Sequence, residues 1–222
     1  AKLNYYLNKD LLFDHVIIFL DISDYYDEAF YQFDTNNLSI THNKKDSRRI
    51  LAKKIFPLTN YYFYVIKKIR KVSKSQVEIS GKNSKILFDE SVTRKTSWLN
   101  KDIKNFKIND KTLFKIHEET KFYMDQIYQI LDKRNIKFSL AIYPWPQNLL
   151  NKKNNYFYRN EWKNFCKTRC DNFFDYFENF SIRVNNQGFE KVYKSYYING
   201  DIHFNKKGNI LIADKIIKTL LN

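Results

Sequence analysis

The chain has 222 residues, a length typical of one domain. Apolar residues make up 43% of it and aromatic residues 18%, which is enough for a hydrophobic core and excludes an intrinsically disordered chain. With 4 glycines and 3 prolines, it is neither collagen-like nor a linker. The net charge of +15 suggests nucleic acid or an anionic surface as a partner, although abundant Lys, Asn, Ile, Tyr and Phe also fit the codon usage of an AT-rich genome.

The N-terminal segment Lys2–Asn8 is typical of a helix already in progress, which favours a start that lies further upstream. No apolar run approaches the roughly 18 to 20 residues of a membrane span, and no signal peptide is visible. Cys166 and Cys170 lie four residues apart on a predicted helix (161–170), a spacing ill-suited to a disulfide. We therefore expect structural or free thiols, and no metal site or cofactor.

The segment His15–Leu20 is a short, continuous apolar run and predicts a buried strand of a parallel sheet. An acidic turn follows it, with Asp21, Ser23 and Asp24. In open α/β sheets, ligands bind beyond the carboxyl ends of the strands. This turn is therefore a candidate edge of a binding site.

The next part of the chain is polar and basic. Tyr31–Asp46 is rich in asparagine and predicts a loop, whereas Arg48–Lys71 predicts a helix in two pieces, interrupted at Pro57. Val72–Asn109 shows no clean period and is dense in lysine. We expect it to form an insertion, or a lid, within a single domain that spans 1–222.

The apolar spacing from Thr112 to Arg134 predicts an amphipathic helix, with the N-cap signal at Asn109–Asp110. His117 lies beside two glutamates on a face that we expect to be exposed. Ile136–Tyr143 predicts a second buried strand, which Pro144-Trp145-Pro146 stops. Trp145 either stacks against a sugar ring or packs within this turn.

Further elements follow towards the C-terminus. The patterns predict a short helix at 161–168, a strand at Asn172–Phe177, a brief strand at Tyr196–Ile198 and a C-terminal helix capped by Asn205. The predicted apolar face of that last helix consists of Ile210, Ala213, Ile217, Leu220 and Leu221. Alternating strands and helices predict an α/β fold with a parallel sheet covered on both faces.

One pair of residues has side chains suited to acid–base catalysis. Asp201 and His203 flank a single residue on a loop that opens a helix. A carboxylate beside a histidine fixes its tautomer and stabilises the imidazolium, and such a histidine can act as general base for a hydroxyl nucleophile.

Three segments resemble the SGNH (GDSL-type) hydrolases. YYINGDIHFNKKGNILIADKI is similar to the last block of that family, in which an Asp and a His precede a helix. DHVIIFLDISDYYDEA resembles the third block, where a strand ends in G-x-N-D, and FSLAIYPWPQNL resembles the strand that leads to the last loops. The three segments occur in the family's order and cover both ends and the middle of the chain.

The resemblance implies an ester-handling serine enzyme on a flavodoxin-like, three-layer α/β/α parallel sheet that is incomplete at its N-terminus. His203 would be the general base and Asp201 its orienting carboxylate. Ser23 takes the place of the oxyanion-hole asparagine and Asp21 that of the neighbouring glycine. The G-D-S serine motif and the second-block glycine are absent from the chain. Either the serine lies upstream of Ala1 or the chain is a degenerate, non-catalytic relative.

The implied partner is an acyl ester of a carbohydrate or a lipid. Acidic turns of this kind are similar to those of subgroups associated with envelope polysaccharide acylation, which implies a bacterial envelope or periplasmic location and an anionic surface as a further contact.

The alternative is a non-catalytic module that binds a glycan with the acidic turn and Trp145. Nucleic-acid binding rests on the net charge of +15 and the many aromatic residues, with Lys67–Lys74 as the best basic patch, and no recognised nucleic-acid motif accompanies them. The family's first strand is central, so a chain without it must leave a gap, close its remaining strands together or expose an unpaired edge.

Overall fold

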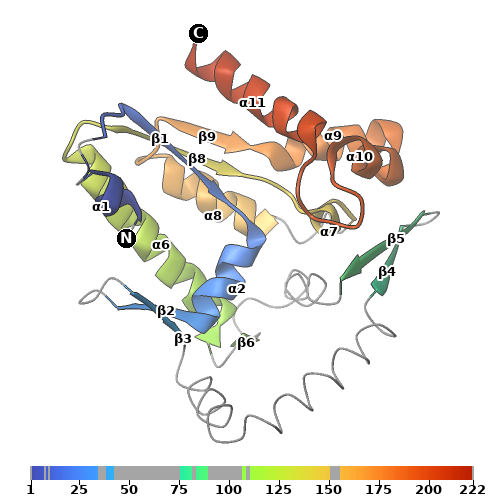
Figure 1. Cartoon of the computed structure of the whole chain (residues 1–222), viewed down its shortest axis with the longest axis horizontal. Coiled ribbons are helices and arrows are strands. Elements are labelled where there is room, and N and C mark those ends of the chain that lie inside the picture. Colours follow the sequence, from blue (N-terminus) through green and yellow to red (C-terminus); the bar gives the residue numbers. More distant parts are fainter. Residues whose placement is uncertain are drawn as a thin grey trace, which may run out of the picture.

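The computed structural model describes residues 2–7, 9, 11–34, 39–42, 76–81, 84–89, 107–108, 111–150 and 156–221. These residues form a mixed α/β structure built on a parallel sheet (Figure 1). The strands are β1 (His15–Leu20), β2 (Tyr31–Asp34), β3 (Ser39–His42), β4 (Gln76–Gly81), β5 (Ser84–Asp89), β6 (Lys107–Ile108), β7 (Lys111–Thr112), β8 (Lys137–Ile142) and β9 (Asn172–Asp175). The helices are α1 (Lys2–Leu7), α2 (Ile22–Phe30), α6 (Leu113–Asp132), α7 (Pro146–Leu150), α8 (Tyr156–Cys166), α9 (Tyr176–Gln187), α10 (Phe189–Tyr196) and α11 (Lys206–Leu220).

The main sheet has three parallel strands in the order β1-β8-β9. The register pairs His15 with Lys137 and Leu20 with Ile142, so the two strands end together at their carboxyl ends. Every residue of β8 after Lys137 is buried, as expected for a central strand. The predicted parallel sheet and the predicted positions of β1 and β8 are thus confirmed.

Side chains from the two faces of the sheet enter two hydrophobic clusters. One cluster contains Leu20, Phe138, Leu140 and Ile142 together with residues of α2, α6 and α8. The other contains Ala141 and Phe174 together with residues of α9, α10 and α11. Because neighbouring residues of a strand point to opposite faces, Leu140 and Ala141 belong to different clusters.

Strand β1 lies at one edge of the sheet (Figure 1). In the part of the chain that the structure describes, β1 pairs with β8 on one side and has no strand on the other. The Phe19 side chain is 44% exposed. An open groove of about 740 Å³ runs beside this edge, with Leu3, Tyr6, Leu11, Phe13, His15, Val16, Ile17, Ile18 and Ile127 as lining residues. The prediction of a buried strand at His15–Leu20 is therefore wrong in its burial: only Leu20 is buried, because β1 has a partner strand on one side alone among the described residues.

One of the polar segments before α6 differs from its prediction, and the insertion or lid at 72–109 stays a prediction. Tyr31–Asp46 is predicted to be a loop, but β2 and β3 form an antiparallel pair within it, because strand-favouring Tyr and Phe lie in β2 and Ile and Thr in β3. Within 72–109, β4 and β5 form a second antiparallel pair. The predicted helix at 48–71 and the basic patch at 67–74 lie outside the described residues.

Helix boundaries in the C-terminal half also needed correction. The N-cap of α6 is Thr112, whose side chain accepts the N–H of Lys115, and not Asn109–Asp110. Strand β9 ends at Asp175 because this side chain caps α9 by accepting the N–H of Phe177. The predicted strand at 196–198 is wrong: α10 runs to Tyr196, and Tyr197 forms a single antiparallel bridge with Phe204. Helices α7, α9 and α10 were not predicted.

Helix α11 begins after its predicted N-cap, Asn205. Its predicted apolar face does not face the core: Ile210 is 49% and Ile217 51% exposed, whereas Ile212 is buried. The face of α11 that packs on the second cluster instead carries Leu211, Ile212 and Ile216. No helix among the described residues is long and apolar enough to cross a bilayer.

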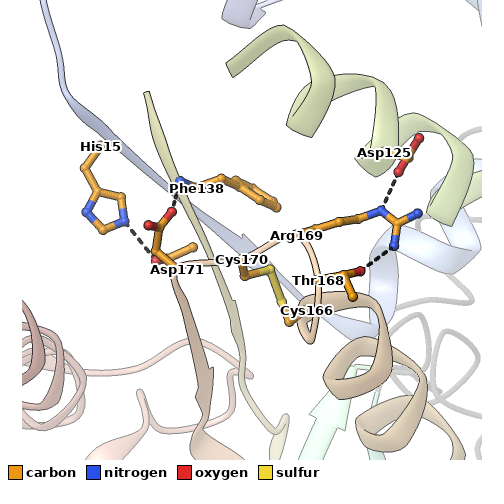
Figure 2. Close-up of a disulfide and its surroundings, with 9 residues drawn as sticks. His15, Asp125, Phe138, Cys166, Thr168, Arg169, Cys170 and Asp171 are labelled. Carbon is orange, nitrogen blue, oxygen red and sulfur yellow. Dashed lines mark hydrogen bonds and ion pairs between the residues drawn. A yellow bond between two sulfur atoms is a disulfide. The ribbon is translucent and has the colours of Figure 1, made fainter. Parts of the chain in front are cut away.

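Cys166 and Cys170 form a disulfide with a Cα–Cα distance of 4.6 Å (Figure 2), so the prediction of free or unpaired thiols is wrong. Helix α8 ends at Cys166, and a turn at 167–169 brings Cys170 back towards it. The two residues therefore do not share one helix. In the same turn, Arg169 forms an ion pair with Asp125 of α6 (Figure 2).

We expect that replacing both cysteines with serine lowers the free energy of unfolding by about 2 kcal/mol, the chain-entropy value for closing a loop of this length. Urea denaturation of the double variant, compared with the oxidised protein, measures this difference. Dithiothreitol should lower the stability of the wild-type protein by a similar amount and leave the double variant unchanged. Equal stability of the oxidised protein and the double variant would contradict the expectation.

Candidate functional site

Asp201 and His203 form the polar pair that the sequence predicts. The Nδ1 atom of His203 lies 2.7 Å from Oδ1 of Asp201. A carboxylate at this position holds the proton on Nδ1, so the Nε2 atom keeps its lone pair. The His203 side chain is 71% exposed, and Nε2 has no partner among the described residues. The pair therefore has the geometry of an oriented general base with an open side.

The Asp201 carboxylate is stabilised in its ionised form. Burial alone raises its pKa, but hydrogen bonds from the His203 side chain and from the backbone N–H groups of His203 and Ile202 outweigh this effect and lower the pKa. These backbone groups donate to Oδ1 over 3.2 Å and 2.6 Å. Asp201 therefore carries a negative charge at neutral pH and can stabilise an imidazolium at His203.

Backbone hydrogen bonds close the loop that carries the pair, residues 196–205. Ile198 N–H donates to the His203 carbonyl over 2.9 Å, and Asn205 N–H donates to the Tyr196 carbonyl over 3.0 Å. At the tip, Asp201 N–H donates to the Ile198 carbonyl over 3.0 Å. Gly200 has a φ of 75° in this turn, a conformation that favours glycine.

Asn205 and Gly208 join the loop to α11. The Asn205 side chain accepts the N–H of Gly208 and donates from Nδ2 to the carbonyls of Ser195 and Tyr197, over 3.1 Å each. A Cβ atom on Gly208 would lie 2.3 Å from the Tyr196 carbonyl oxygen. The helix start and the loop thus approach each other as closely as a glycine allows.

The acidic turn after β1 is held together by its own hydrogen bonds. Asp21 caps α2 and forms a capping box with Asp24. Oδ1 of Asp21 accepts the N–H and the hydroxyl of Ser23, over 2.6 Å each, and Oδ2 accepts the hydroxyl of Tyr143 over 2.9 Å. The Ser23 hydroxyl proton is engaged here, so Ser23 must reorient before it can donate to an oxyanion. Its role in an oxyanion hole stays a prediction.

Tyr143 connects the acidic turn to the Asp201–His203 loop. It follows β8 directly, and its ring centroid lies 5.5 Å from that of Phe204, the neighbour of His203. Burial, together with the charge of Asp21, raises the pKa of the Tyr143 phenol far above its usual range, so the hydroxyl remains a donor. Tyr197 adds a second link through a 2.8 Å hydrogen bond to the Pro144 carbonyl. Both polar groups therefore lie at the carboxyl end of the sheet.

Trp145 does not face this site. It is 2% exposed and belongs to the cluster that contains Phe138 and Leu140, which supports the packed-turn alternative over sugar stacking. Tyr143 and Phe204 link the two halves of the site, a contact that the sequence did not predict. The position of Tyr143 at the end of a predicted strand was the available signal.

Comparisons with protein-family models, with curated proteins and with solved structures gave no match. Family membership therefore stays a proposal that rests on the motifs and on the site geometry. Within the described ranges, no three His, Cys, Asp or Glu side chains are grouped so that they could hold a metal ion.

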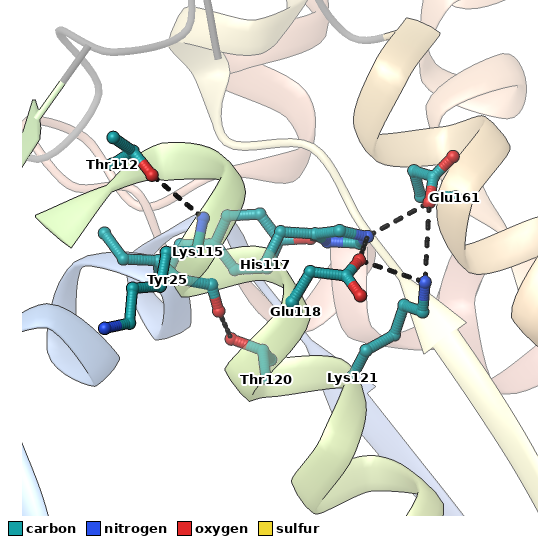
Figure 3. A network of polar contacts seen from close by, with 9 residues as sticks. Tyr25, Thr112, Lys115, His117, Glu118, Thr120, Lys121 and Glu161 are labelled. Atoms are coloured by element: carbon teal, nitrogen blue, oxygen red, sulfur yellow. Dashed lines mark hydrogen bonds and ion pairs between the residues drawn. The ribbon is translucent and has the colours of Figure 1, made fainter. Parts of the chain in front are cut away.

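A second polar cluster lies inside the protein, around His117 (Figure 3). The prediction of an exposed His117 is wrong, because this side chain is fully buried between α2, α6 and α8. Its Nε2 atom lies 3.1 Å from the Glu161 carboxylate, and its Nδ1 atom is hydrogen-bonded to the Tyr25 hydroxyl. Nε2 therefore carries the proton, and Nδ1 accepts from Tyr25. The His117 side chain has no exposed surface, so we assign it to the core.

Burial lowers the pKa of His117, although the neighbouring Glu161 and Glu118 oppose this effect. The unfolded chain then binds more protons than the folded one below about pH 6.5, so stability is lost as the pH falls through this region. We expect the free energy of unfolding to decrease from pH 7 to pH 5.5 and the slope to be smaller in His117→Gln. Urea denaturation across this range measures both slopes, and equal slopes would contradict the expectation.

Proposed function

We propose that this chain carries the His–Asp part of an SGNH-like serine esterase or O-acyltransferase that acts on an acyl ester of a carbohydrate or a lipid. The observation that carries the proposal is the His203–Asp201 pair, with Nδ1 bound to the carboxylate and Nε2 open to solvent at the carboxyl end of a parallel sheet. The order of the three motif-bearing segments along the chain supports it.

In the proposed reaction, Nε2 of His203 removes the proton of a serine hydroxyl as its oxygen attacks the ester carbonyl. Asp201 stabilises the imidazolium that forms, and His203 returns the proton to the alcohol that leaves. Water or an acceptor hydroxyl then attacks the acyl-serine, with the same proton transfers in reverse order. Hydrolysis and acyl transfer differ only in this last nucleophile.

The serine belongs, in this proposal, to a segment upstream of Ala1. Among the described residues β1 has a partner strand on one side only, which supports this arrangement, because a strand added in parallel on the other side would end near the acidic turn. The complete sheet would then have the flavodoxin-like, three-layer arrangement that the resemblance implies. A bacterial envelope or periplasmic location, and contact with an anionic surface, belong to the same proposal.

The alternative, a non-catalytic glycan-binding module, has less support from the two side-chain groups on which it depends. Trp145 is buried in the core, and the Asp21 carboxylate already accepts three hydrogen bonds from Ser23 and Tyr143. Neither group is placed to meet a sugar ring without rearrangement.

The test uses the chain extended by the coding sequence upstream of Ala1. We expect the extended protein to hydrolyse p-nitrophenyl acetate and to be labelled at one upstream serine by a fluorophosphonate probe. The 222-residue chain is the matched control and should show neither property. An extended protein without turnover or labelling would overturn the esterase proposal and favour the non-catalytic alternative, as would a coding sequence that contains no serine after an upstream apolar strand.

A further inference from the structure

The Tyr193 side chain of α10 occupies the centre of the loop that carries Asp201 and His203. The residue is 1% exposed, and its ring stacks on Tyr197 with a centroid distance of 5.7 Å. Its hydroxyl lies 2.9 Å from the Ile198 carbonyl oxygen and 3.1 Å from that of Asp201. The same hydroxyl accepts the N–H of Asp201 over 3.1 Å.

This hydroxyl contacts both sides of the turn at the loop tip. The Asp201 N–H is shared between the Ile198 carbonyl, 3.0 Å away, and the Tyr193 oxygen. Burial raises the pKa of the Tyr193 phenol, so the group stays protonated and donates to a carbonyl at any physiological pH. The loop that carries the exposed Asp201–His203 pair is thus held by a buried hydroxyl from α10.

We propose that the Tyr193 hydroxyl is a positioning group, which fixes the backbone of Asp201 so that its carboxylate meets Nδ1 of His203. Asp201 has no other side-chain anchor among the described residues: its carboxylate binds only His203 and the two backbone N–H groups that follow it. Movement of the Asp201 backbone would therefore move the carboxylate relative to the imidazole. The catalytic consequence rests on the proposed function, whereas the structural part can be tested without it.

Tyr193→Phe keeps the buried ring and removes only the hydroxyl. Tyr176→Phe is the matched control, because Tyr176 is also buried and donates to a single backbone carbonyl, that of Ile212, over 2.9 Å. Tyr176→Phe removes one buried hydrogen bond, whereas Tyr193→Phe removes a donated bond and the bond accepted from Asp201 N–H, so both should lower stability and Tyr193→Phe the more. Of these two tyrosines, only Tyr193 forms hydrogen bonds with the loop of the Asp201–His203 pair.

The structural readout is NMR of the 222-residue chain with labelled histidine and aspartate. In wild type, we expect His203 to carry its proton on Nδ1 and the Asp201 carboxyl to titrate below its ordinary range. In Tyr193→Phe, we expect the Nδ1–H form to decrease and the Asp201 pKa to move up towards its ordinary value. Asp201→Asn marks complete loss of the Nδ1–carboxylate contact.

An unchanged His203 tautomer and Asp201 titration in Tyr193→Phe would overturn the proposal, as would equal changes in Tyr176→Phe. In the extended protein, Tyr193→Phe should lower kcat for p-nitrophenyl acetate by about ten- to a hundred-fold without changing KM, since misplacement of a base costs rate and not binding. Spectroscopic changes in a protein without esterase activity would support the positioning role and contradict the proposed function. The two proposals can therefore fail separately.

Discussion

Replacing His203 with alanine is expected to lower kcat for ester hydrolysis by the extended protein by about 10²- to 10⁴-fold, with little change in KM. General acid–base catalysis contributes a factor of this size, and the imidazole acts on the proton of the nucleophile and not on substrate binding. The side chain is 71% exposed and contacts Asp201 alone among the described residues, so its removal should leave the fold intact.

The measurement is steady-state hydrolysis of p-nitrophenyl acetate, with circular dichroism to confirm folding. Lys206→Ala is the matched control, because it removes a different exposed basic side chain at the start of α11 and should retain wild-type turnover. Added imidazole should restore part of the activity of His203→Ala, since a free base can occupy the vacated position. Turnover of His203→Ala equal to wild type would show that His203 is not the general base.

The second large effect is expected at Gly208, which we predict cannot accept even a methyl group. In Gly208→Ala the new Cβ would lie 2.3 Å from the Tyr196 carbonyl oxygen and 2.9 Å from two atoms of the Phe204 side chain. Alanine gains up to about 1 kcal/mol over glycine in a helix interior. Forced overpacking against a fixed backbone typically costs about 1–3 kcal/mol, so we expect a net loss of stability.

The added methyl group should push the Tyr196 carbonyl away from α11. This carbonyl accepts the N–H of Asn205 at the base of the Asp201–His203 loop, so the loop should also be disturbed. We therefore expect Gly208→Ala to lose both stability, measured in urea, and the Nδ1–H signal of His203.

Gly188→Ala provides the comparison: a Cβ there meets nothing within 4 Å, but the φ of 82° strains it. That variant should lose about 1 kcal/mol of stability and keep the His203 signal. A Gly208→Ala protein more stable than wild type would show that helix propensity outweighs the clash.

The two helices that flank the Asp201–His203 loop show which features a sequence pattern can reveal. The N-cap at Asn205 is local, since its side chain bonds a backbone group three residues on, and it was predicted correctly. Helix α10 was missed, because its buried side chains, Val192, Tyr193 and Tyr196, are interspersed with charged residues over only eight positions. The role of Tyr193 depends on a contact between α10 and the loop that no spacing rule encodes.

The errors at Cys166, Cys170 and His117 have a common cause. Each was judged from the apparent helix on which it lies: a continuous helix from 161 to 170 would separate the two sulfurs, and the glutamates beside His117 suggested an exposed face. In the structure, α8 ends at Cys166, and Tyr25 and Glu161 from two other helices cover His117. Helix ends and helix neighbours are set by tertiary packing, which overrides local pattern.

The sequence by itself determined the parallel α/β core and the Asp201–His203 pair, because a continuous apolar run, a cap and a one-residue spacing are local properties of the chain. Only the tertiary structure decided that β1, within the described residues, has a strand on one side alone, that Trp145 is buried, that Tyr143 links the acidic turn to Phe204 and that Tyr193 holds the Asp201 backbone. These features depend on contacts between residues that are distant in the sequence. Two of the 4 glycines have different roles there: Gly200 permits the turn and Gly208 the close approach that position the loop of His203.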